Sequence, residues 1–594
     1  MYAAPLQDMR FALDLAGLDK VLGLPGLEAH DRELVDAVLE EAAKLASEVM
    51  APLNATGDRE SSRLENGVVR TPTGFKDAYR AFVAGGWNGL PFGAEVGGQG
   101  LPVLVHTAVA EMWNASNLSL SLCPMLTYAA VEAILHHGTD AQRATYLPKL
   151  VTGEWTGTMN LTEPQAGTDL GQIKTRAARD GDHFRITGQK IFITYGDHDL
   201  ADNIVHMVLA RIEGAPQGTR GISLFLVPKY LVKQDGSLGA RNDLRAVSLE
   251  HKLGIRASPT CVMAYGDNGG AVGYLVGEEN RGLNCMFTMM NHARLGVGLE
   301  GVAIGERAYQ QARDYARQRI QSRDIAGDDA RPVAIIRHPD VRRMLLAMRA
   351  QTEAARAFNY YVAALLDRSK REPDEAARAD ALAFVDLLTP IAKAWSTDQG
   401  VEVASLGIQI HGGMGFIEET GAAQHYRDAR IAPIYEGTNG IQANDLMGRK
   451  LGRDGGETAR RFIAEMAKLD VPLASARNPE IAALRAPLRD GVDALETATR
   501  WMVETMAQDM RRAAAGAVEY LRLFGTVAGG WAMARAALEA ARRLAAREGD
   551  AAFHEAKLVT ARFYADTVLA RAPASLAPLM RAGDSVLALA EEQF

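Results

Sequence analysis

The sequence HFRITGQKIFIT, residues 183–194, is rich in β-branched and aromatic residues and contains a Thr-Gly turn pair. Similar runs follow it in NIVHMVLARI (203–212), GISLFLVPKY (221–230) and CVMAYGD (261–267). Such residues favour strands, and the Gly-containing pairs that separate several of the runs are typical of tight turns. The sequence therefore predicts an antiparallel β domain over residues 156–280.

Helical patterns flank this β domain on both sides. Apolar residues recur at helical spacing in HDRELVDAVLEEAAKLASEVMAPL (30–53) and again from residue 286 through MFTMMNHARLGVGLEGVAIGERAYQQARDYARQR. Helices before and after a block of strands do not give the alternation that builds a parallel sheet. We predict a mainly α protein with a central antiparallel β domain: an N-terminal helical domain (1–155), the β domain (156–280), a second helical domain (281–450) and a helical extension (451–594).

The extension carries one apolar stripe at spacings of three and four residues. Its members are Val518, Leu521, Phe524, Ala528 and Trp531. A stripe with this period marks the buried face of an amphipathic helix, so we expect it to pack on the preceding helices.

Composition excludes several functional classes. The chain has 594 residues, 47% of them hydrophobic and 23% charged, and a net charge of -8, which gives no electrostatic basis for binding nucleic acid. Its three cysteines are far apart and predict neither a disulfide framework nor a metal site. No run of 18 or more apolar residues predicts a membrane span, and Asp8, Arg10 and Asp14 interrupt any secretory signal. A soluble, cytoplasmic protein is expected.

Two segments carry residues suited to chemistry. In RDARIAPIYEGTNGIQ (427–442), Glu436 lies between Tyr435 and a glycine, where partial desolvation would raise its pKa toward that of a general base. A glutamate before a glycine is also common as a solvated turn residue, and that alternative stays open. In MNLTEPQAGTDL (159–170), Thr162 and Thr168 offer hydroxyls and Gly167 a close backbone approach to a flat ligand or a phosphate, or else the segment is an ordinary turn.

Taken together, the motifs resemble those of the acyl-CoA dehydrogenase family over about residues 30–450. LTEPQAGTD and KIFIT resemble the family's flavin-side loop and strand, and KLGIRASPTC (252–261) matches a further family stretch. YARQR (315–319), QIHGGMGF (409–416) and IYEGTNGIQ (434–442) resemble its cofactor-binding and catalytic segments. The glycine cluster GGMGFIEE (412–419) lacks the GxGxxG spacing of a Rossmann fingerprint, so a nucleotide must be held in another way.

The resemblance implies FAD as cofactor, an acyl-CoA thioester as substrate and Glu436 as catalytic base. It places Met159, Leu161, Thr162, Gly167 and Thr168 along the flavin and its phosphates, with Phe192 and Thr194 against the ring and Thr438 near the catalytic carboxylate. Arg319, His338, Gln409, Gly412 and Gly413 would hold the adenosine-diphosphate half across a subunit interface, as an arginine fork suits phosphate oxygens. Thr168, Asn291, Arg294 and Tyr435 would contact the substrate.

Some residues depart from the family pattern. Asn291 stands where an aspartate is usual, and Ala293 stands where some branches carry their base, which leaves Glu436 as the candidate. Phe192 replaces a common tryptophan and keeps an apolar plate over the ring. Ser322 replaces a phenylalanine, and the stretch to His338 is longer than usual.

The resemblance further implies α,β-desaturation to a trans-2-enoyl-CoA, as in fatty acid β-oxidation, with an electron-transferring flavoprotein as electron acceptor. The extension is similar to that of a long bacterial branch that includes 3-methylmercaptopropionyl-CoA dehydrogenases, which implies a homodimer and 3-methylthiopropanoyl-CoA or short and medium acyl-CoAs as substrates. An acyl-CoA oxidase is the first alternative. The second is a flavin-containing DNA-binding stress protein of the same fold, which needs a basic surface that the charge-balanced extension does not supply.

Overall fold

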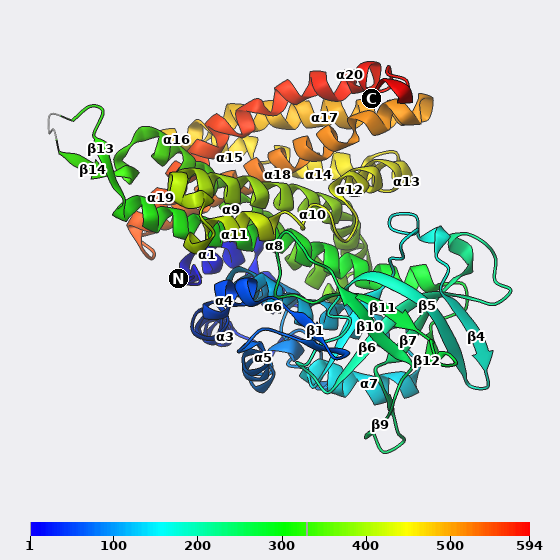
Figure 1. Ribbon diagram of the computed structural model, residues 1–594. Coiled ribbons are helices and arrows are strands. Elements are labelled where there is room, and N and C mark those ends of the chain that lie inside the picture. The colour runs from blue at the N-terminus through cyan, green and yellow to red at the C-terminus, as the bar shows by residue number, and fades with distance from the viewer. Residues whose placement is uncertain (1, 328–330) are drawn as a thin grey trace.

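The structure, a computed structural model, describes residues 2–327 and 331–594, except for the side chains of Asn291 and His292. In Figure 1 the N-terminal helices and the β domain form the lower half of the molecule. The longest helices cross the middle, and the C-terminal helices lie on top. The predicted fold class, mainly α with a central β domain and a C-terminal helical extension, is confirmed by this arrangement.

The N-terminal part is helical, apart from one small hairpin. It comprises α1 (Leu6–Ala16), α2 (Leu18–Leu22), α3 (Arg32–Lys44), α4 (Pro52–Glu60), β1 (Arg63–Glu65), β2 (Val68–Arg70), α5 (Phe75–Ala84), α6 (Val103–His137) and α7 (Asp140–Thr152).

Helix α6 is the central helix of this part. It is kinked at Asn117, whose backbone is not helical and whose side-chain Oδ1 accepts from the N–H of Leu120 at 3.1 Å, as an N-cap residue does. By length and hydropathy α6 could cross a membrane, although no unbroken run of 18 apolar residues predicts this in the sequence. However, 83% of its most apolar stretch is buried inside the protein, as expected of a core helix.

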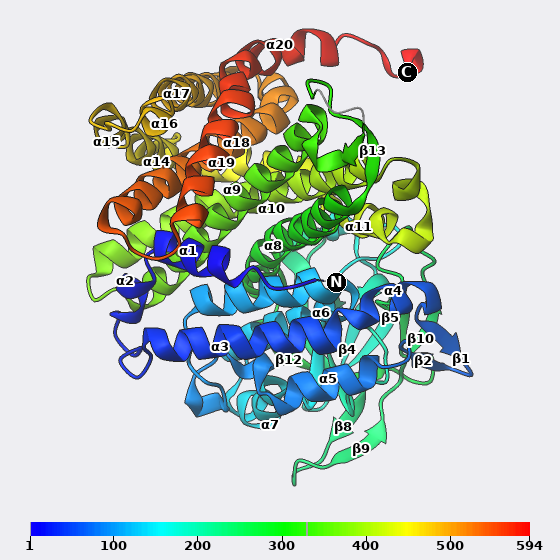
Figure 2. The same ribbon diagram turned by 90° about the vertical axis from the view of Figure 1, so that its left-hand side faces the viewer.

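The β domain is one eight-stranded sheet in the order β10-β11-β5-β12-β7-β6-β3, with β4 pairing with β5 and β6. Most neighbours are antiparallel, as predicted, but β3 and β4 each pair with β6 in parallel. The loop after β3 leads into the antiparallel pair of β4 and β5 instead of a hairpin with β3, and β6 then returns in the same direction as β3. The strands are β3 (Trp155–Asn160), β4 (Arg176–Asp180), β5 (His183–Thr194), β6 (Asn203–Ile212), β7 (Ile222–Pro228), β10 (Leu244–Leu249), β11 (Thr260–Tyr265) and β12 (Ala271–Val276). The hairpin of β8 (Tyr230–Val232) and β9 (Leu238–Arg241) projects at the bottom of Figure 2.

Three long helices form the second helical part: α8 (Gly282–Gln318), α9 (Pro339–Arg371) and α10 (Glu375–His411). A buried ion network joins two of them to α6, because Arg356 on α9 pairs with Glu111 at 2.7 Å and with Glu306 at 2.8 Å. The hairpin of β13 (Ile320–Arg323) and β14 (Pro332–Ala334) extends from the end of α8, at the left of Figure 1. The short helices α11 (Ala422–Ala429) and α12 (Asn439–Asp445) follow α10.

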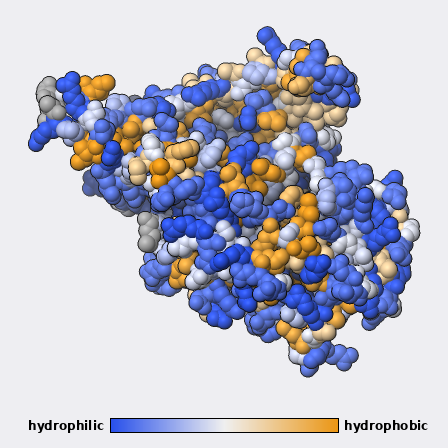
Figure 3. Space-filling model, viewed as in Figure 1, coloured by the Kyte–Doolittle hydropathy of each residue, from blue (hydrophilic) through white to orange (hydrophobic). Residues whose placement is uncertain are grey.

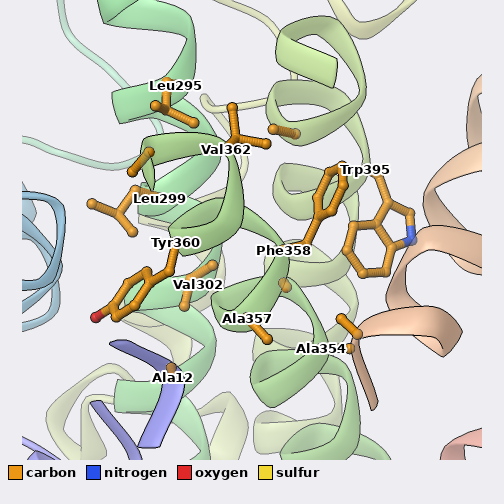
Figure 4. Packing of buried hydrophobic residues seen from close by; sticks show 14 of the residues in the cluster. Ala12, Leu295, Leu299, Val302, Ala354, Ala357, Phe358, Tyr360, Val362 and Trp395 are labelled. Atoms are coloured by element: carbon orange, nitrogen blue, oxygen red, sulfur yellow. The ribbon is translucent and has the colours of Figure 1, made fainter. Parts of the chain in front are cut away.

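The extension consists of α13 (Gly452–Asp454), α14 (Glu457–Ala467), α15 (Asp470–Ala474), α16 (Pro479–Ala482), α17 (Arg485–Gln508), α18 (Met510–Ala546), α19 (Ala551–Thr567) and α20 (Leu576–Val586). Its predicted apolar stripe lies on α18, where every member except the 38%-exposed Val518 is buried. Figure 4 shows Trp395 of α10 directed toward the ribbon of this helix. The ring fits there because a Cβ at Gly525 of α18 would lie 2.3 Å from its Cγ.

The extension also holds the N-terminus. Figure 2 shows α1 close to α18 and α19. Asp14 of α1 pairs with Arg543 of α18 at 2.7 Å, and Asp8 pairs with Lys557 of α19. Residues more than 500 positions apart are thereby joined, so the extension and the first helix form one folded unit with the central helices.

Candidate active site

A cleft of about 340 Å³ lies between the β domain and the helices α8 and α12. Figure 3 shows apolar side chains gathered where the β domain meets the helical part. The cleft brings together most of the predicted flavin-side and catalytic residues. Its lining includes Met159, Leu161, Thr162, Gly167, Thr168, Phe192, Thr194, Arg294 and Glu436.

Glu436 lies in the turn between α11 and α12. Its backbone is left-handed, with φ 56°, and Gly437 follows with φ 84°. A side chain at Gly437 would also meet the amide of Gln442, since a Cβ there would lie 2.9 Å from Nε2. The paired left-handed residues turn the Glu436 side chain into the cleft, in a conformation that non-glycine residues rarely adopt.

The surroundings of Glu436 suit a base. The side chain is half-buried, and burial raises the pKa of its carboxyl above the ordinary value, while the cations Arg294 and Lys393 act in the opposite direction. A carboxylate with a raised pKa binds a proton more strongly and is a more effective general base. Within the described residues, the N–H of Glu436 donates to no protein acceptor, so it can donate to a ligand oxygen.

Two arginines add positive charge to the cleft. Arg294 of α8 is 4% exposed and its Nη1 lies 3.3 Å from Asp445 Oδ2. Arg449 pairs with the other oxygen of Asp445, keeps half of its side chain exposed and lies over the ring of Phe287. The buried arginine is fixed in place, whereas the exposed one lies at the cleft's solvent side, where an anionic ligand would enter.

The β-domain wall of the cleft is shaped by a bulge. Cys261 of β11 pairs with Ile193 and Met263 pairs with Lys190, so two residues of β5 face one residue of β11. Phe192 takes the irregular position with φ 60°, and its ring is 58% exposed. The bulge therefore presents an aromatic face to the cleft.

This wall fits the flat cofactor that the resemblance implies. Met159, Leu161 and Phe192 supply apolar surface, and the hydroxyl groups of Thr162 and Thr168 lie on the adjoining loop. A Cβ added at Gly167 would meet nothing within 4 Å, so the loop faces open space there. Apolar walls with a few polar groups are typical of cofactor sites.

An ion pair that sequence reasoning missed holds the loop after β3. Glu163 is 3% exposed, and its Oε1 lies 2.8 Å from Nζ of the fully buried Lys190. The same carboxylate accepts from the N–H of Lys174 at 2.6 Å and from the hydroxyl of Thr175 at 2.6 Å, and Lys190 also donates to the carbonyl of Leu161 at 2.9 Å. The loop that carries Thr162, Gly167 and Thr168 is thus fixed from beneath.

Two residues predicted at the catalytic turn, Tyr435 and Thr438, do not line the cleft. Tyr435 points the other way and donates its hydroxyl to Glu300. Thr438 caps α12 by accepting from the N–H of Ile441 at 3.2 Å. The side chain of Asn291 lies outside the described residues.

The residues predicted to hold the adenosine-diphosphate half lie at the far end of α8 and α10. Arg319 follows α8 and is exposed, and His338 Nε2 donates to the carbonyl of Gln321 in the adjoining hairpin at 2.8 Å. The ends of α8 and α10 are joined by Tyr315, which stacks on His411 at 4.4 Å. Gln409, Gly412 and Gly413 are exposed at this end, and a Cβ at either glycine would meet nothing within 4 Å.

This group lies far from the cleft. Arg319 comes 25 residues after Arg294, and at 1.5 Å per residue they are separated by roughly 37 Å along α8.

A second cavity, of about 80 Å³, adjoins the cleft along α6 and α8. Met125 and Ala293 line it, and their chain neighbours Leu126 and Arg294 line the cleft. Trp87, Trp113 and Leu299 make the cavity mostly apolar. A chain attached to a ligand in the cleft can extend into this space.

Comparison with known proteins gives matches along most of the chain. Family models match as "Acyl-CoA dehydrogenase, N-terminal domain" (residues 33–154), "middle domain" (158–267), "C-terminal domain" (280–451) and "Acetyl-CoA dehydrogenase C-terminal like" (460–590). The chain is 51% identical to 3-methylmercaptopropionyl-CoA dehydrogenase of Ruegeria pomeroyi, covering 99% of both chains. It is 33% identical to a butyryl-CoA dehydrogenase of Syntrophomonas wolfei, over 100% of this chain and 99% of the relative. An acyl-CoA dehydrogenase from Bacillus anthracis, solved with FAD, is 21% identical and superposes with a TM-score of 0.73 over 96% of this chain and 91% of that one.

Proposed function

The chain belongs to the acyl-CoA dehydrogenase family and is an oxidoreductase acting on acyl-CoA thioesters, and we propose that Glu436 is its base and that it desaturates short acyl groups. The observation that carries the assignment is the position of Glu436: a half-buried carboxylate with a raised pKa, directed into a cleft whose opposite wall fits a flat cofactor. We propose FAD as that cofactor, in line with the FAD complex of the Bacillus anthracis relative. Bound FAD would supply the acceptor for the β-hydrogen, which leaves the substrate as hydride.

Glu436 would remove the α-proton of the thioester. Its own N–H would donate to the thioester oxygen and stabilise the negative charge that develops there, an effect worth about 3 kcal/mol in comparable oxyanion sites. Arg294 favours the ionised form of Glu436 before the reaction, and burial makes proton transfer to it favourable. Positioning both C–H bonds between the carboxylate and the opposite wall is the cleft's main contribution.

The adjoining cavity supports a short acyl group. An apolar cavity of about 150 Å³ accommodates benzene, so the cavity of about 80 Å³ that adjoins the cleft should hold roughly three non-hydrogen atoms. With the thioester carbon, the α-carbon and the β-carbon in the cleft, the cleft and the cavity together take an acyl chain of up to about six carbons. A methylthio group after the β-carbon fits as well. The names of the Ruegeria and Syntrophomonas relatives agree with this range, and we propose 3-methylthiopropanoyl-CoA and butyryl-CoA as substrates.

We further propose a cytoplasmic homodimer that passes electrons to an electron-transferring flavoprotein. The separation of roughly 37 Å between the cleft and Arg319 supports the dimer, because a second chain must supply the distal residues. Exposed apolar residues at that end, among them Phe416 (84%) and Ile325 (84%), provide surface for a partner subunit.

A panel of saturated acyl-CoAs from four to twelve carbons, with 3-methylthiopropanoyl-CoA added, tests the proposal when scored by loss of flavin absorbance without oxygen. We expect the highest kcat/KM at four to six carbons and for the methylthio compound. The Leu299→Ala variant should move the optimum to longer chains, because Leu299 lines the cavity and is 1% exposed. A parent enzyme that prefers ten or twelve carbons would refute the short-chain assignment.

A further inference from the structure

Beneath the catalytic turn lies a group of buried ionisable side chains with no role in the mechanism above. Lys393 of α10 is 0% exposed, and its Nζ donates to the carbonyl of Gly437 at 3.0 Å and to Oδ1 of Asn439 at 2.9 Å. Glu300 of α8 is also 0% exposed and accepts from the hydroxyl of Tyr435. Its other oxygen, Oε1, has no hydrogen-bond partner within the described chain. Lys393 and Glu300 thus contact the residues on either side of Glu436.

We propose that Lys393 is a positioning residue for the reaction: its ammonium fixes the turn that aims Glu436 into the cleft, and its charge favours the carboxylate form of Glu436. This proposal rests on the assignment of Glu436 as the base. The carboxyl groups of Glu300, Glu436 and Asp398 favour the protonated form of the lysine in this buried place.

The geometry shows why a buried ammonium is needed at this point. Glu436 has a left-handed backbone, a conformation that persists only where the surroundings hold it. Gln442 Nε2 lies 3.2 Å from the carbonyl of Glu436, and Lys393 binds the next carbonyl. Asn439 is itself fixed to α10, since its Nδ2 donates to Asp398 at 2.8 Å. Among these anchors, the lysine alone carries a positive charge.

The charges around Lys393 come from three elements. Glu300 and Arg294 face it from α8, Glu436 from the catalytic turn and Asp398 from its own helix. Burial lowers the pKa of Lys393 to about 8, against the opposing effect of the three carboxyl groups, and Arg294 lowers it further. The side chain is therefore still mostly protonated at neutral pH. Burial raises the pKa of Glu300 to about 8. The pKa values of Glu300 and Lys393 thus both lie near 8, so a change of charge at a neighbouring residue changes how far each of them is protonated.

The test compares Lys393→Met, Lys393→Arg and Glu300→Gln in the FAD-loaded enzyme, through the pH dependence of kcat/KM. We expect Lys393→Met to move the acid limb to higher pH by about one unit, the order of effect that a nearby opposite charge has on a carboxyl, because Lys393 lowers the pKa of Glu436 and its charge is lost. Lys393→Arg should restore the limb to within a few tenths of a unit. Glu300→Gln should leave the limb in place or move it to lower pH.

Lys557→Met is the matched control, because Lys557 is another buried, paired lysine, on α19. We expect it to lower the melting temperature without moving the acid limb. Should Lys393→Met not fold, the double variant Lys393→Met/Glu300→Gln must have its acid limb at higher pH than Glu300→Gln alone. An acid limb of Lys393→Met equal to the parent's, or of the double variant equal to that of Glu300→Gln, would overturn the proposal.

A second readout needs no turnover. The infrared difference between the parent and Glu436→Gln reports the protonated carboxyl of Glu436 directly, and its titration should move to higher pH when Lys393→Met is present in both proteins. An unchanged titration contradicts the role of Lys393 alone. If Glu436→Gln itself retains full activity, the proposed function fails instead, so the two failures can be told apart.

Discussion

The Glu163–Lys190 pair makes a quantitative prediction about the loop that lines the cofactor cleft. The pKa of Glu163 is lowered from 4.5 to about 2, against the effect of burial, by Lys190, Thr175 and the N–H of Lys174. At 1.36 kcal/mol per unit, the ionised form is stabilised by about 3 kcal/mol. Burial lowers the pKa of Lys190 from 10.5 to about 8, which is a cost of similar size. The stabilisation of ionised Glu163 and the cost of burying charged Lys190 therefore nearly cancel. Each of the two residues needs the charge of the other to stay ionised.

We predict that Glu163→Gln weakens the loop by about 3 kcal/mol, because it leaves the ammonium of Lys190 buried without a counter-charge. The double variant Glu163→Gln/Lys190→Met should lose much less, since both charges are removed. The loss in the single variant should be complete above pH 4.5 and should shrink as the pH falls toward 2. That sign follows because a carboxyl with a lowered pKa stabilises the fold above its unfolded-state pKa and loses this contribution as it is protonated.

Hydrogen exchange of peptides covering residues 161–175 is the assay, with FAD retention after desalting as the functional readout. A loss of about 3 kcal/mol corresponds to roughly a hundredfold faster exchange by local opening. FAD should dissociate more readily from the single variant than from the double variant. Exchange within about threefold of the parent in Glu163→Gln would refute the reasoning, and so would a double variant that is as unstable as the single one.

Two further variants test the extension and the cleft's solvent side. Gly525→Ala should lower stability by about 1–3 kcal/mol and reduce the melting temperature, because its Cβ would lie 2.3 Å from Trp395. Gly448→Ala is its control, as a Cβ there meets nothing within 4 Å, and an equal loss in both variants would contradict close packing at α18. Arg449→Ala should raise the KM for acyl-CoA about two- to fivefold at low salt with little change in kcat, as expected for one exposed charge. Arg453→Ala, an exposed arginine paired with Asp386, should leave KM unchanged, and a KM for Arg449→Ala equal to the parent's would remove Arg449 from substrate binding.

Residue types predicted the order of helical part, β domain, second helical part and helical extension. They could do so because apolar residues recur at strand or helix spacing wherever one face of an element is buried. They also predicted the burial of Leu521, Phe524, Ala528 and Trp531. The parallel pairing of β3 with β6 was not predictable, since it depends on where the chain returns after β4 and β5 and not on any local pattern.

The site shows the same division between local and long-range information. Glu436, Phe192 and Thr162 lie in short motifs, and all three line the cleft. Two residues that hold them were not predicted for the site: Lys190 lies in the KIFIT motif but was given no role, and Lys393 lies outside the quoted motifs. A charged residue inside an apolar or small-residue stretch, as in IAKAWS around Lys393, was the available signal. Tyr435 was expected to face the substrate, but its neighbour's left-handed turn directs it toward Glu300.

Anaerobic mixing of the Glu436→Gln variant with 3-methylthiopropanoyl-CoA tests the central assignment most directly. The variant should retain FAD and bind the thioester, because glutamine keeps the shape of the side chain and the turn is held by Lys393 and Gln442. Its flavin absorbance should stay unchanged over times at which the parent is fully bleached. Bleaching at the parent's rate would show that another group removes the α-proton.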